Sequence, residues 1–383
     1  MMEKQKICII GGNLTGLVTA MALSKLNCQI DLITGNANQN YQSNRTIAVS
    51  ENNFDFLNKL NISESLKREV WTCSIMKLYT EIKNEKFSKI FELNNENRQE
   101  KILYMLENSK IMKLMMSKIQ QIKSISVKNH KKVSSISTSG LLKSVKFNNN
   151  ISKYNLVIIC TGYNSSLIKN IFNDQMIENS YKESAITTIL SHSSHKNNTV
   201  RQIFLKNEIL ALLPISNTKT SIVWFVKNDV RKKNDLFLKK KIKLYAKNYL
   251  KNIKFATNIE YKGLNLLIRN KYYLDRTLLF GDALHVIHPF VGQGFNMTLK
   301  DLACLEKILT QKINLGLDIG SFDVLSEFSS ETKPRNFAFS VGVDLLKNSF
   351  SYKKLRNSIL MILNKSNFAK DIFFEIANKG FRF

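Results

Sequence analysis

Long apolar runs are missing from this chain of 383 residues, and no stretch approaches the eighteen or so consecutive apolar residues of a membrane-spanning helix. The N-terminal residues, MMEKQKICIIGG, pass into an apolar strand without the longer apolar stretch and small-residue cleavage site of a signal peptide. These two absences argue against a transmembrane or secreted protein, and we expect a cytoplasmic one.

Cysteine and histidine are also scarce. The five cysteines are never spaced as CxxC, which argues against a disulfide framework or a zinc site and favours a reducing compartment. They are Cys8, Cys28, Cys73, Cys160 and Cys304. His130, His192 and His195 show no metal-ligand spacing, because the last two would meet only on a helix and their serine-rich surroundings indicate a loop or strand. We therefore predict no metal site.

Acidic residues are few beside the basic ones, with 30 Asp and Glu against 57 Lys and Arg and a formal net charge of +27. Such an excess raises the question of nucleic acid. Most of the basic residues are lysines dispersed among Asn and Ile, however, whereas bidentate recognition of phosphates and bases favours arginine. We predict no nucleic-acid partner and interpret the excess as solvated surface. Attraction to the anionic inner face of a membrane, as a peripheral protein, is an additional hypothesis.

What is present is an ordinary globular composition, 44% hydrophobic and 23% charged, in a chain long enough for two interleaved domains. Residues 7–10 and 29–34 predict strands on either side of a glycine turn and a helical stretch, which together make a β-α-β unit. Residues 156–160 and 277–280 predict two further buried strands, and residues 184–226 predict a β-rich part.

Two other stretches have the apolar spacing of helices. One is residues 102–119. The other begins after Asn296 and continues to the end of the chain, with Pro334 as its single interruption.

A glycine turn follows the first strand. Gly11, Gly12 and Gly16 supply the tight bend and the close backbone approach that a dinucleotide pyrophosphate needs at a helix N-terminus. Asn13 stands at the middle glycine position, and Thr34 stands where an acidic residue would bind a ribose hydroxyl. By itself, this segment is equally compatible with a β-turn-helix that binds nothing.

A more specific segment, GDALHVIHPFVGQGFN, occupies residues 281–296. Asp282 follows an apolar strand and places a carboxylate where it could accept hydrogen bonds from a ribitol or ribose hydroxyl. The loop 292–294 leads into a helix whose N-terminal amides suit an electron-rich flavin edge. A plain tight turn would explain neither the two glycines around Gln293 nor the nearby Pro289.

This segment resembles the signature of the para-hydroxybenzoate-hydroxylase-like flavoprotein monooxygenases, and specifically that of their ubiquinone-biosynthesis hydroxylase branch. Residues 45–50 (RTIAVS), 102–108 (ILYMLEN), 211–215 followed by 222–224, and 334–335 followed by 344–346 are similar to further segments of that branch. All three prolines of the chain lie in the matched segments: Pro214, Pro289 and Pro334. The resemblance covers nearly the whole chain.

The resemblance implies an α/β fold, in which a Rossmann-type FAD-binding domain is interleaved with a β-rich substrate domain and followed by a C-terminal helical region. We predict the FAD-binding domain at residues 1–70, 100–175 and 270–340, the substrate domain at 71–99 and 176–269, and the C-terminal helical region at 341–383.

The resemblance also implies FAD-dependent hydroxylation of a polyprenylated phenol ring in ubiquinone biosynthesis. NAD(P)H would be the electron donor, O₂ the co-substrate and a flavin hydroperoxide the oxygen donor. Pro289 and His288 are the predicted catalytic positions at the reactive edge of the flavin, and His285 is expected to be structural. The predicted cofactor-binding residues are Gly11, Gly12, Asn13, Gly16, Arg45, Gly281, Asp282, Gly292, Gln293, Gly294 and Asn296.

Three residues depart from the family pattern: Asn13, Thr34, and Thr161, which replaces the aspartate of an Asp-Gly motif. In the family, that aspartate is associated with the handling of both FAD and NAD(P)H. These departures leave open a flavin-poor or inactive structural partner in a quinone-biosynthesis complex. Another phenol hydroxylase, an epoxidase or a flavin reductase of prenyl chains would also suit the fold.

A polyprenylated substrate is nearly insoluble, so it must be met at a membrane surface or on a partner protein. In residues 355–383, apolar side chains recur at near-helical spacing with Lys and Arg between them. Two interpretations stay open. This face packs on the FAD-binding domain, or it makes a peripheral contact with a membrane.

Overall fold

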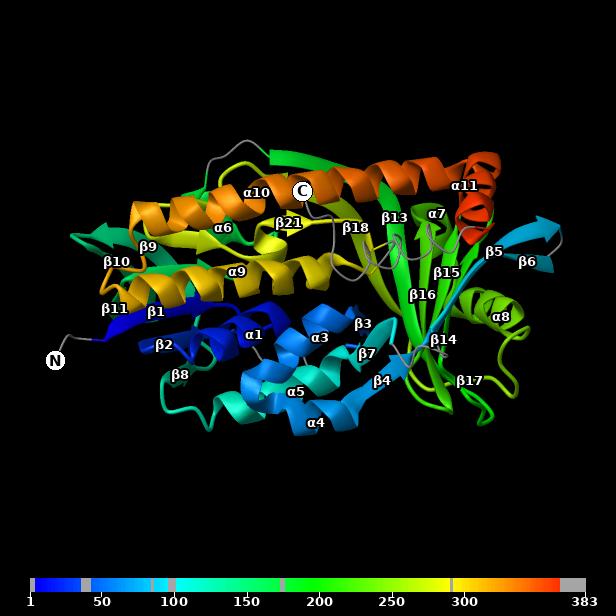
Figure 1. Ribbon diagram of the computed structural model, residues 1–383, viewed down its shortest axis with the longest axis horizontal. Helices are drawn as coiled ribbons and strands as arrows, with labels where there is room; N and C mark the ends of the chain where they lie inside the picture. Colours follow the sequence, from blue (N-terminus) through cyan, green and yellow to red (C-terminus); the bar gives the residue numbers. More distant parts are fainter. Residues whose placement is uncertain are drawn as a thin grey trace.

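The computed structural model describes residues 4–35, 43–83, 86–95, 101–172, 176–289 and 292–365. Two large sheets follow one another along the long axis of the molecule, and helix α10 (Phe322–Ser351) spans both of them (Figure 1). Together with the helices that cover them, these sheets confirm the predicted α/β class.

The first sheet has six strands and contains the short apolar runs that the sequence predicts as strands. Its order is β19 (Tyr273–Leu274), β20 (Thr277–Leu279), β12 (Leu156–Ile159), β1 (Gln5–Ile10), β2 (Cys28–Ile33) and β8 (Ile125–Lys128). Only β19 runs antiparallel to its neighbour; the other pairs are parallel. Strand β12 is apolar throughout and β1 is apolar over residues 7–10, because both faces of a parallel sheet are covered. Helices α1 (Leu14–Leu23), α5 (Asn108–Ile119) and α9 (Gly294–Asn314) share its core.

The second sheet has nine strands. Along its main path they are β21 (His285–Val286), β18 (Glu260–Arg269), β13 (Met176–Ser191), β16 (Lys219–Lys227), β15 (Ile209–Pro214), β14 (Thr199–Phe204), β5 (Ile75–Lys83) and β6 (Lys86–Asn94). The ninth, β17 (Lys254–Phe255), pairs with β13. Helix α8 (Asp235–Ala246) packs its buried face on the sheet around Trp224.

Two smaller antiparallel sheets and several short helices complete the described part of the chain. One sheet contains β9 (Val133–Ser139), β10 (Leu142–Phe147) and β11 (Asn150–Tyr154). The other contains β3 (Thr46–Val49), β7 (Leu103–Glu107) and β4 (Val70–Cys73). The short helices are α3 (Glu51–Leu57), a π-helical turn η1 (Asn58–Ile62), α4 (Ser63–Glu69), α6 (Ser166–Ile171), α7 (Asn228–Arg231) and a 3₁₀ turn η3 (Gly281–Ala283).

The large sheet draws on segments that are far apart in the sequence. Strand β5 pairs in parallel with β14, and the short strand β21 adds to the edge formed by β18. Helix α10 crosses residue 341, where the C-terminal helical region was predicted to begin. The division of the chain into an FAD-binding and a substrate domain stays a proposal.

The prediction of a helix over residues 102–119 was wrong in its first part. Residues 103–107 form strand β7, which pairs with β3 on one side and β4 on the other. Met105 is fully buried, and the ring of Tyr104 stacks on Phe54 at a centroid distance of 4.0 Å. Cross-strand packing therefore overrides the helical spacing until Asn108, where α5 begins.

Pro334 does not interrupt the C-terminal helical part as predicted, because it lies inside α10. The residues that follow it are anchored to the buried carboxylate of Asp301 in α9. Arg335 Nη2 donates to Asp301 Oδ1 at 2.6 Å, and Asn336 Nδ2 donates to Oδ2 at 2.9 Å. These contacts offset the backbone hydrogen bond that a proline removes. The breaks occur instead between α9 and α10 and at Tyr352.

Helix α11 (Lys353–Lys365) is the described part of the predicted C-terminal amphipathic stretch; residues 366–383 lie outside the described residues. It packs against β6 of the large sheet, in the part of the chain that the sequence analysis assigned to the substrate domain. Leu360 is buried in a cluster with Phe91, Phe204 and Phe350. On its other side Leu355, Met361 and Ile362 are exposed.

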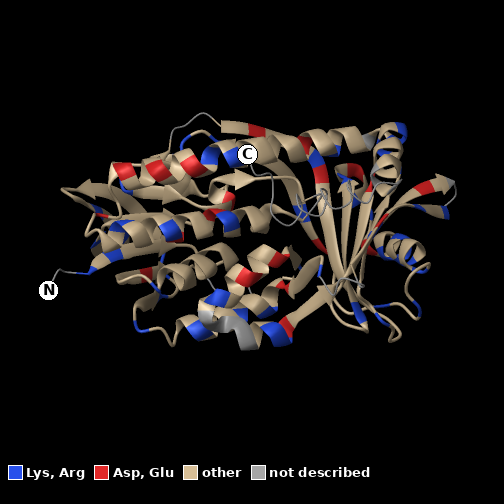
Figure 2. Cartoon of the chain, in the orientation of Figure 1, with Lys and Arg blue, Asp and Glu red and all other residues tan. Residues whose placement is uncertain are grey.

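Charge is spread over the surface: Lys and Arg lie on both halves of the molecule rather than along one stripe (Figure 2). Within the described ranges, no helix combines the length and the apolar character needed to cross a bilayer.

Candidate active site

The predicted cofactor residues gather at the carboxyl ends of the parallel strands. The Gly11 amide donates to the Ile33 carbonyl at 3.0 Å, and the Cys160 amide donates to Ile10 at 2.8 Å. The Phe280 amide, one residue before Gly281, donates to Ile159 at 3.0 Å. The ends of β1, β2, β12 and β20 are thereby held together. A crevice outside these ends is where open α/β sheets bind nucleotides.

The glycine turn is packed so closely that side chains would not fit. Gly11 has a φ of +138°, and a Cβ atom there would lie 2.7 Å from the Cys160 carbonyl oxygen. A Cβ on Gly16 would collide with the carbonyl oxygen of Gly11, which is the contact that brings α1 against the turn. Gly281 has a φ of +63°, and its Cβ would lie 2.5 Å from Thr15 Cγ2. Two separate motifs of the sequence thus meet at the start of α1.

The N-terminus of α1 is suited to an anion. Its N-cap, Asn13, is exposed, and the Asn13 side chain makes no capping hydrogen bond. The first turn carries no acidic residue that would compete with a bound phosphate. The partial positive charge of the helix end and its free amides therefore favour a pyrophosphate at this point.

Two buried hydroxyl groups give an independent test of whether a polar cofactor fits. Thr161 Oγ1, two residues after the end of β12, and Thr46 Oγ1, directly after Arg45, are buried and have no hydrogen-bond partner among the described residues. Buried hydroxyls normally have a partner, so these two leave hydrogen-bonding capacity for a polar ligand at this edge. Thr161, a departure from the family pattern, still presents a polar group there. Thr34 does not, because its hydroxyl donates to Asn129 Oδ1 at 2.9 Å.

Arg45, Asp282 and Lys262 form a charged group at the same edge. Arg45 and Asp282 are both exposed. Burial lowers the pKa of Lys262 on β18; the charge of Arg45 lowers it further, whereas Asp282 raises it. Lys262 therefore lies near both of the other charges. Two cations and one carboxylate can bind a phosphate and a polyol hydroxyl side by side.

The predicted flavin loop is closed at its base. The Gly292 amide donates to the Pro289 carbonyl at 2.9 Å, and Gly292 has a φ of +65° that favours glycine. Gln293 is the N-cap of α9, and Gly294 is the first residue of that helix. The first turn of α9 carries no acidic residue, so its amides suit an electron-rich ring edge.

Asn296 connects this loop by hydrogen bonds to residues 48–53. Its Oδ1 accepts from the Ser50 amide at 3.1 Å and from Asn53 Nδ2 at 2.9 Å, and its Nδ2 donates to the Ala48 carbonyl at 2.9 Å. The residue is almost fully buried. With its amide group engaged in this way, Asn296 would act on a cofactor through the loop it positions.

The two histidines of the segment have different surroundings. His285 Nε2 donates to Asp301 Oδ2 at 2.8 Å, and both side chains are buried, which agrees with a structural role. His288 is fully buried, and its Nε2 donates to Glu183 Oε2 on β13 at 3.1 Å. His288 therefore links the flavin loop to the large sheet.

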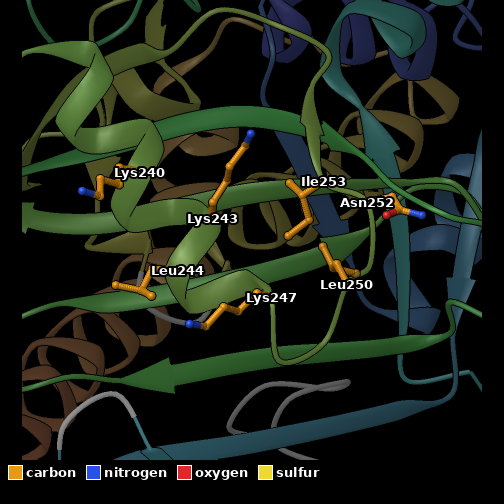
Figure 3. Close-up of a pocket in the computed structure, with 7 residues that line it drawn as sticks. All are labelled: Lys240, Lys243, Leu244, Lys247, Leu250, Asn252 and Ile253. Atoms are coloured by element: carbon orange, nitrogen blue, oxygen red, sulfur yellow. The ribbon is translucent and has the colours of Figure 1, made fainter.

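Some features of the surface stand apart from this group. A hollow of about 390 Å³ lies beside the C-terminal half of α8 and is lined by lysines and apolar residues (Figure 3). None of the predicted site residues lines it.

His192 and His195 approach to a ring-centroid distance of 4.9 Å although neither is helical, so the expectation that they would meet only on a helix was wrong. Backbone hydrogen bonds to Thr218 and Asn217 fold that segment back.

Within the described ranges, no three His, Cys, Asp or Glu side chains come together as metal ligands could.

Three charged residues were missed by the sequence analysis: Lys262, Glu183 and Lys347. None belongs to a motif, and only the strand pairing and the packing of α10 bring them to the site. For the residues that were predicted, contact with the cofactor stays a prediction.

Comparison with known proteins gives matches over nearly the whole chain. A family model described as an FAD binding domain matches residues 4–335. The mitochondrial ubiquinone biosynthesis monooxygenase COQ6 of Dictyostelium discoideum is 23% identical over 449 residues, covering 96% of this chain and 89% of that protein. The ubiquinone hydroxylase UbiL of Rhodospirillum rubrum is 28% identical over 182 residues, covering 45% and 41%.

Among solved structures, p-nitrophenol 4-monooxygenase PnpA of Pseudomonas putida DLL-E4 matches with a TM-score of 0.82 at 13% identity, covering 99% of each chain. At this identity, the match shows a shared fold.

Proposed function

This chain belongs to the FAD binding domain family as an FAD-dependent aromatic-ring monooxygenase, and we propose that its substrate is a polyprenylated phenol on the route to ubiquinone. The observation that carries the substrate proposal is the match to a ubiquinone biosynthesis monooxygenase over 96% of the chain. The family match confirms the predicted FAD cofactor.

The residues at the strand ends would hold FAD in two parts. The N-terminal amides of α1 would bind the pyrophosphate, and Arg45 would add a positive charge beside it. Asp282 would accept hydrogen bonds from the ribitol hydroxyls. Pro289, residues 292–294 and the first amides of α9 would lie against the reactive edge of the ring.

Bound FAD supplies the redox chemistry: it takes electrons from NAD(P)H and activates O₂. The protein has to hold the phenol ring against the flavin and keep water out. Pro289 and the buried His288 would line the side of the site that faces the large sheet. An electron-rich phenol does not require a strong base, and we propose no general base.

A first test is whether the phenol controls electron flow. The FAD-loaded protein should oxidise NAD(P)H slowly by itself and faster when a polyprenylated phenol is added, because the aromatic ring completes the site. Stopped-flow absorbance of the flavin would follow this step. A protein that purifies colourless and cannot be reconstituted with FAD would instead be the inactive structural partner that the three family departures left open.

We further propose that the substrate is collected at an anionic membrane surface by α11. Met361 and Ile362 are 55% and 68% exposed on this helix. Lys353 and Lys354 are also exposed, at its start. An amphipathic helix with basic residues beside apolar ones binds in the interfacial plane of anionic bilayers.

Replacing Met361 and Ile362 together by glutamine should weaken binding to anionic vesicles. Each removes an apolar side chain whose burial in the interface contributes roughly 1.5–3 kcal/mol at most. Co-sedimentation with vesicles of anionic and of neutral lipid measures the effect. Leu141→Gln is the matched control, because Leu141 is 82% exposed on the β9–β10 turn. Equal sedimentation of the double variant and the wild type would rule out α11 as the membrane contact.

A further inference from the structure

A chain of polar side chains, of which His288 is buried and Glu183 and Lys347 are half-buried, connects the flavin loop to two other parts of the molecule. Next to Pro289, His288 donates through Nε2 to Glu183 Oε2 at 3.1 Å. The other carboxylate oxygen, Glu183 Oε1, accepts from Lys347 Nζ at 3.0 Å. Glu183 is on β13 of the large sheet, and Lys347 is on α10. One carboxylate therefore joins the loop, the sheet and the long helix.

Aromatic rings enclose this chain. Tyr181 meets the His288 ring edge to face, with centroids 4.9 Å apart, and Phe225 of β16 approaches it at 5.2 Å. The Lys347 ammonium lies 4.6 Å from the centroid of the Tyr181 ring. The Tyr181 hydroxyl in turn donates to Asp344 Oδ1 at 2.8 Å. These contacts fix the position of every polar member of the chain.

The backbone of β13 is distorted where it supplies these side chains. Ser180 is opposite Asn265 of β18 and Ser184 is opposite Gly263, so three residues of β13 bulge out against one of β18. The middle one, Lys182, has a φ of +54°, which is unfavourable for a side chain larger than glycine. Its two neighbours are Tyr181 and Glu183. Bulges and strained residues of this kind re-aim side chains at functional sites.

The charges of Glu183 and Lys347 determine the protonation state of His288. A carboxylate only accepts hydrogen bonds, so the proton of the neutral ring is on Nε2. Burial lowers the pKa of His288, the Glu183 carboxylate raises it, and the Lys347 ammonium lowers it. Burial alone would raise the pKa of Glu183, but hydrogen bonds from His288 and Lys347 outweigh it and leave that pKa below its ordinary value. A neutral imidazole beside an ionised carboxylate is the resulting state at neutral pH.

We propose that Glu183 and Lys347 are positioning residues of the hydroxylation site, which fix the orientation and tautomer of His288 and thereby hold the loop that begins at Pro289. This inference rests on the proposed placement of that loop at the flavin edge. It makes α10, far along the chain from the glycine turn, a functional part of the site.

Two substitutions should move the acid transition of His288 in opposite directions. Glu183→Gln removes the carboxylate that stabilises the imidazolium, so the transition should move to lower pH. Lys347→Met removes a cation that disfavours the imidazolium, so the transition should move to higher pH. Lys347→Arg keeps the charge and should stay near the wild type. The groups that face the ring and enter this balance are Glu183 and Tyr181 of β13 and Lys347 and Asp344 of α10.

The experiment is a ¹³C NMR titration of the ring Cε1–H signals in FAD-loaded, histidine-labelled protein. The His288 signal is assigned as the one absent from a His288→Asn variant. The buried His285 signal reports whether each variant keeps its fold, and Lys146→Met, a loss of charge at an exposed position of β10, is the control. The same variants are then assayed for kcat/KM over pH, where Glu183→Gln should lose roughly ten- to a hundredfold, the usual effect of misplacing a reacting group.

Opposite movements of the His288 signal and of the acid limb of kcat/KM would support the proposal. An unchanged signal, or movement in one direction for both variants, would overturn it. A kcat/KM equal to that of the wild type in both Glu183→Gln and Lys347→Met would also overturn it. If the wild type shows the titration but turns over no prenylated phenol, the proposed function fails. In that case the wavelength of the flavin absorbance band tests the positioning role. We expect the band of the Glu183→Gln and Lys347→Met variants to be shifted from that of the wild type, because the loop moves. An unshifted band would reject the positioning role.

Discussion

Gly16→Ala is expected to bind FAD about five- to a hundredfold more weakly than the wild type. Gly16 is buried in the first turns of α1, and a Cβ there would collide with the backbone carbonyl oxygen of Gly11. A backbone atom cannot rotate away, so the glycine turn and α1 must separate, at the usual overpacking cost of roughly 1–3 kcal/mol. That turn carries the predicted pyrophosphate contacts, and a cost of this size corresponds to the stated loss of affinity.

Fluorescence titration of the apoprotein with FAD measures this effect. Gly342→Ala is the matched control, since Gly342 is also helical and a Cβ there would meet no heavy atom within 4 Å. Its greater helix propensity should stabilise the protein by up to about 1 kcal/mol and leave FAD affinity unchanged. An equal FAD affinity for Gly16→Ala and the wild type would show that the cofactor is held away from the glycine turn.

Asp282→Ala should weaken FAD binding by about ten- to a hundredfold. The exposed carboxylate lies in the 3₁₀ turn η3 that follows β20, where the proposed charge-assisted hydrogen bonds to ribitol hydroxyls would contribute roughly 1.5–3 kcal/mol. This loss converts to the stated change in dissociation constant.

Two further variants separate this effect from a general change in charge. Asp282→Asn keeps a carbonyl acceptor and should lose less affinity than the alanine variant. Glu178→Ala removes an exposed acid from β13 and should bind FAD like the wild type. If the Asp282 and Glu178 alanine variants retain flavin equally, Asp282 does not contact the cofactor.

Local patterns were enough to predict the part of the fold on which the cofactor residues are placed. Apolar runs gave the central strands of the six-stranded sheet, and glycines marked the turns between those strands and helices. These features depend on neighbours in the sequence. The spacing of Gly11 and Gly16, for example, has a direct counterpart in their backbone contact.

Long-range packing decided the features that were missed. Residues 103–107 have helical spacing but become the central strand of a small sheet. Pro334 continues a helix because the residues after it are anchored on Asp301. Glu183 and Lys347 are 164 positions apart and meet only after β13 bulges and α10 packs beside it. No local pattern encodes such a contact.

We propose that this chain uses FAD and O₂ to place a hydroxyl group on a polyprenylated phenol ring. The most direct measurement is mass spectrometry of the phenol after incubation with FAD-loaded protein, NAD(P)H and ¹⁸O₂, with the substrate supplied in anionic vesicles. We expect a ring product that carries one atom of ¹⁸O, formed as NAD(P)H is consumed. Recovery of unchanged phenol while NAD(P)H is oxidised, or a product whose new oxygen comes from water, would contradict it.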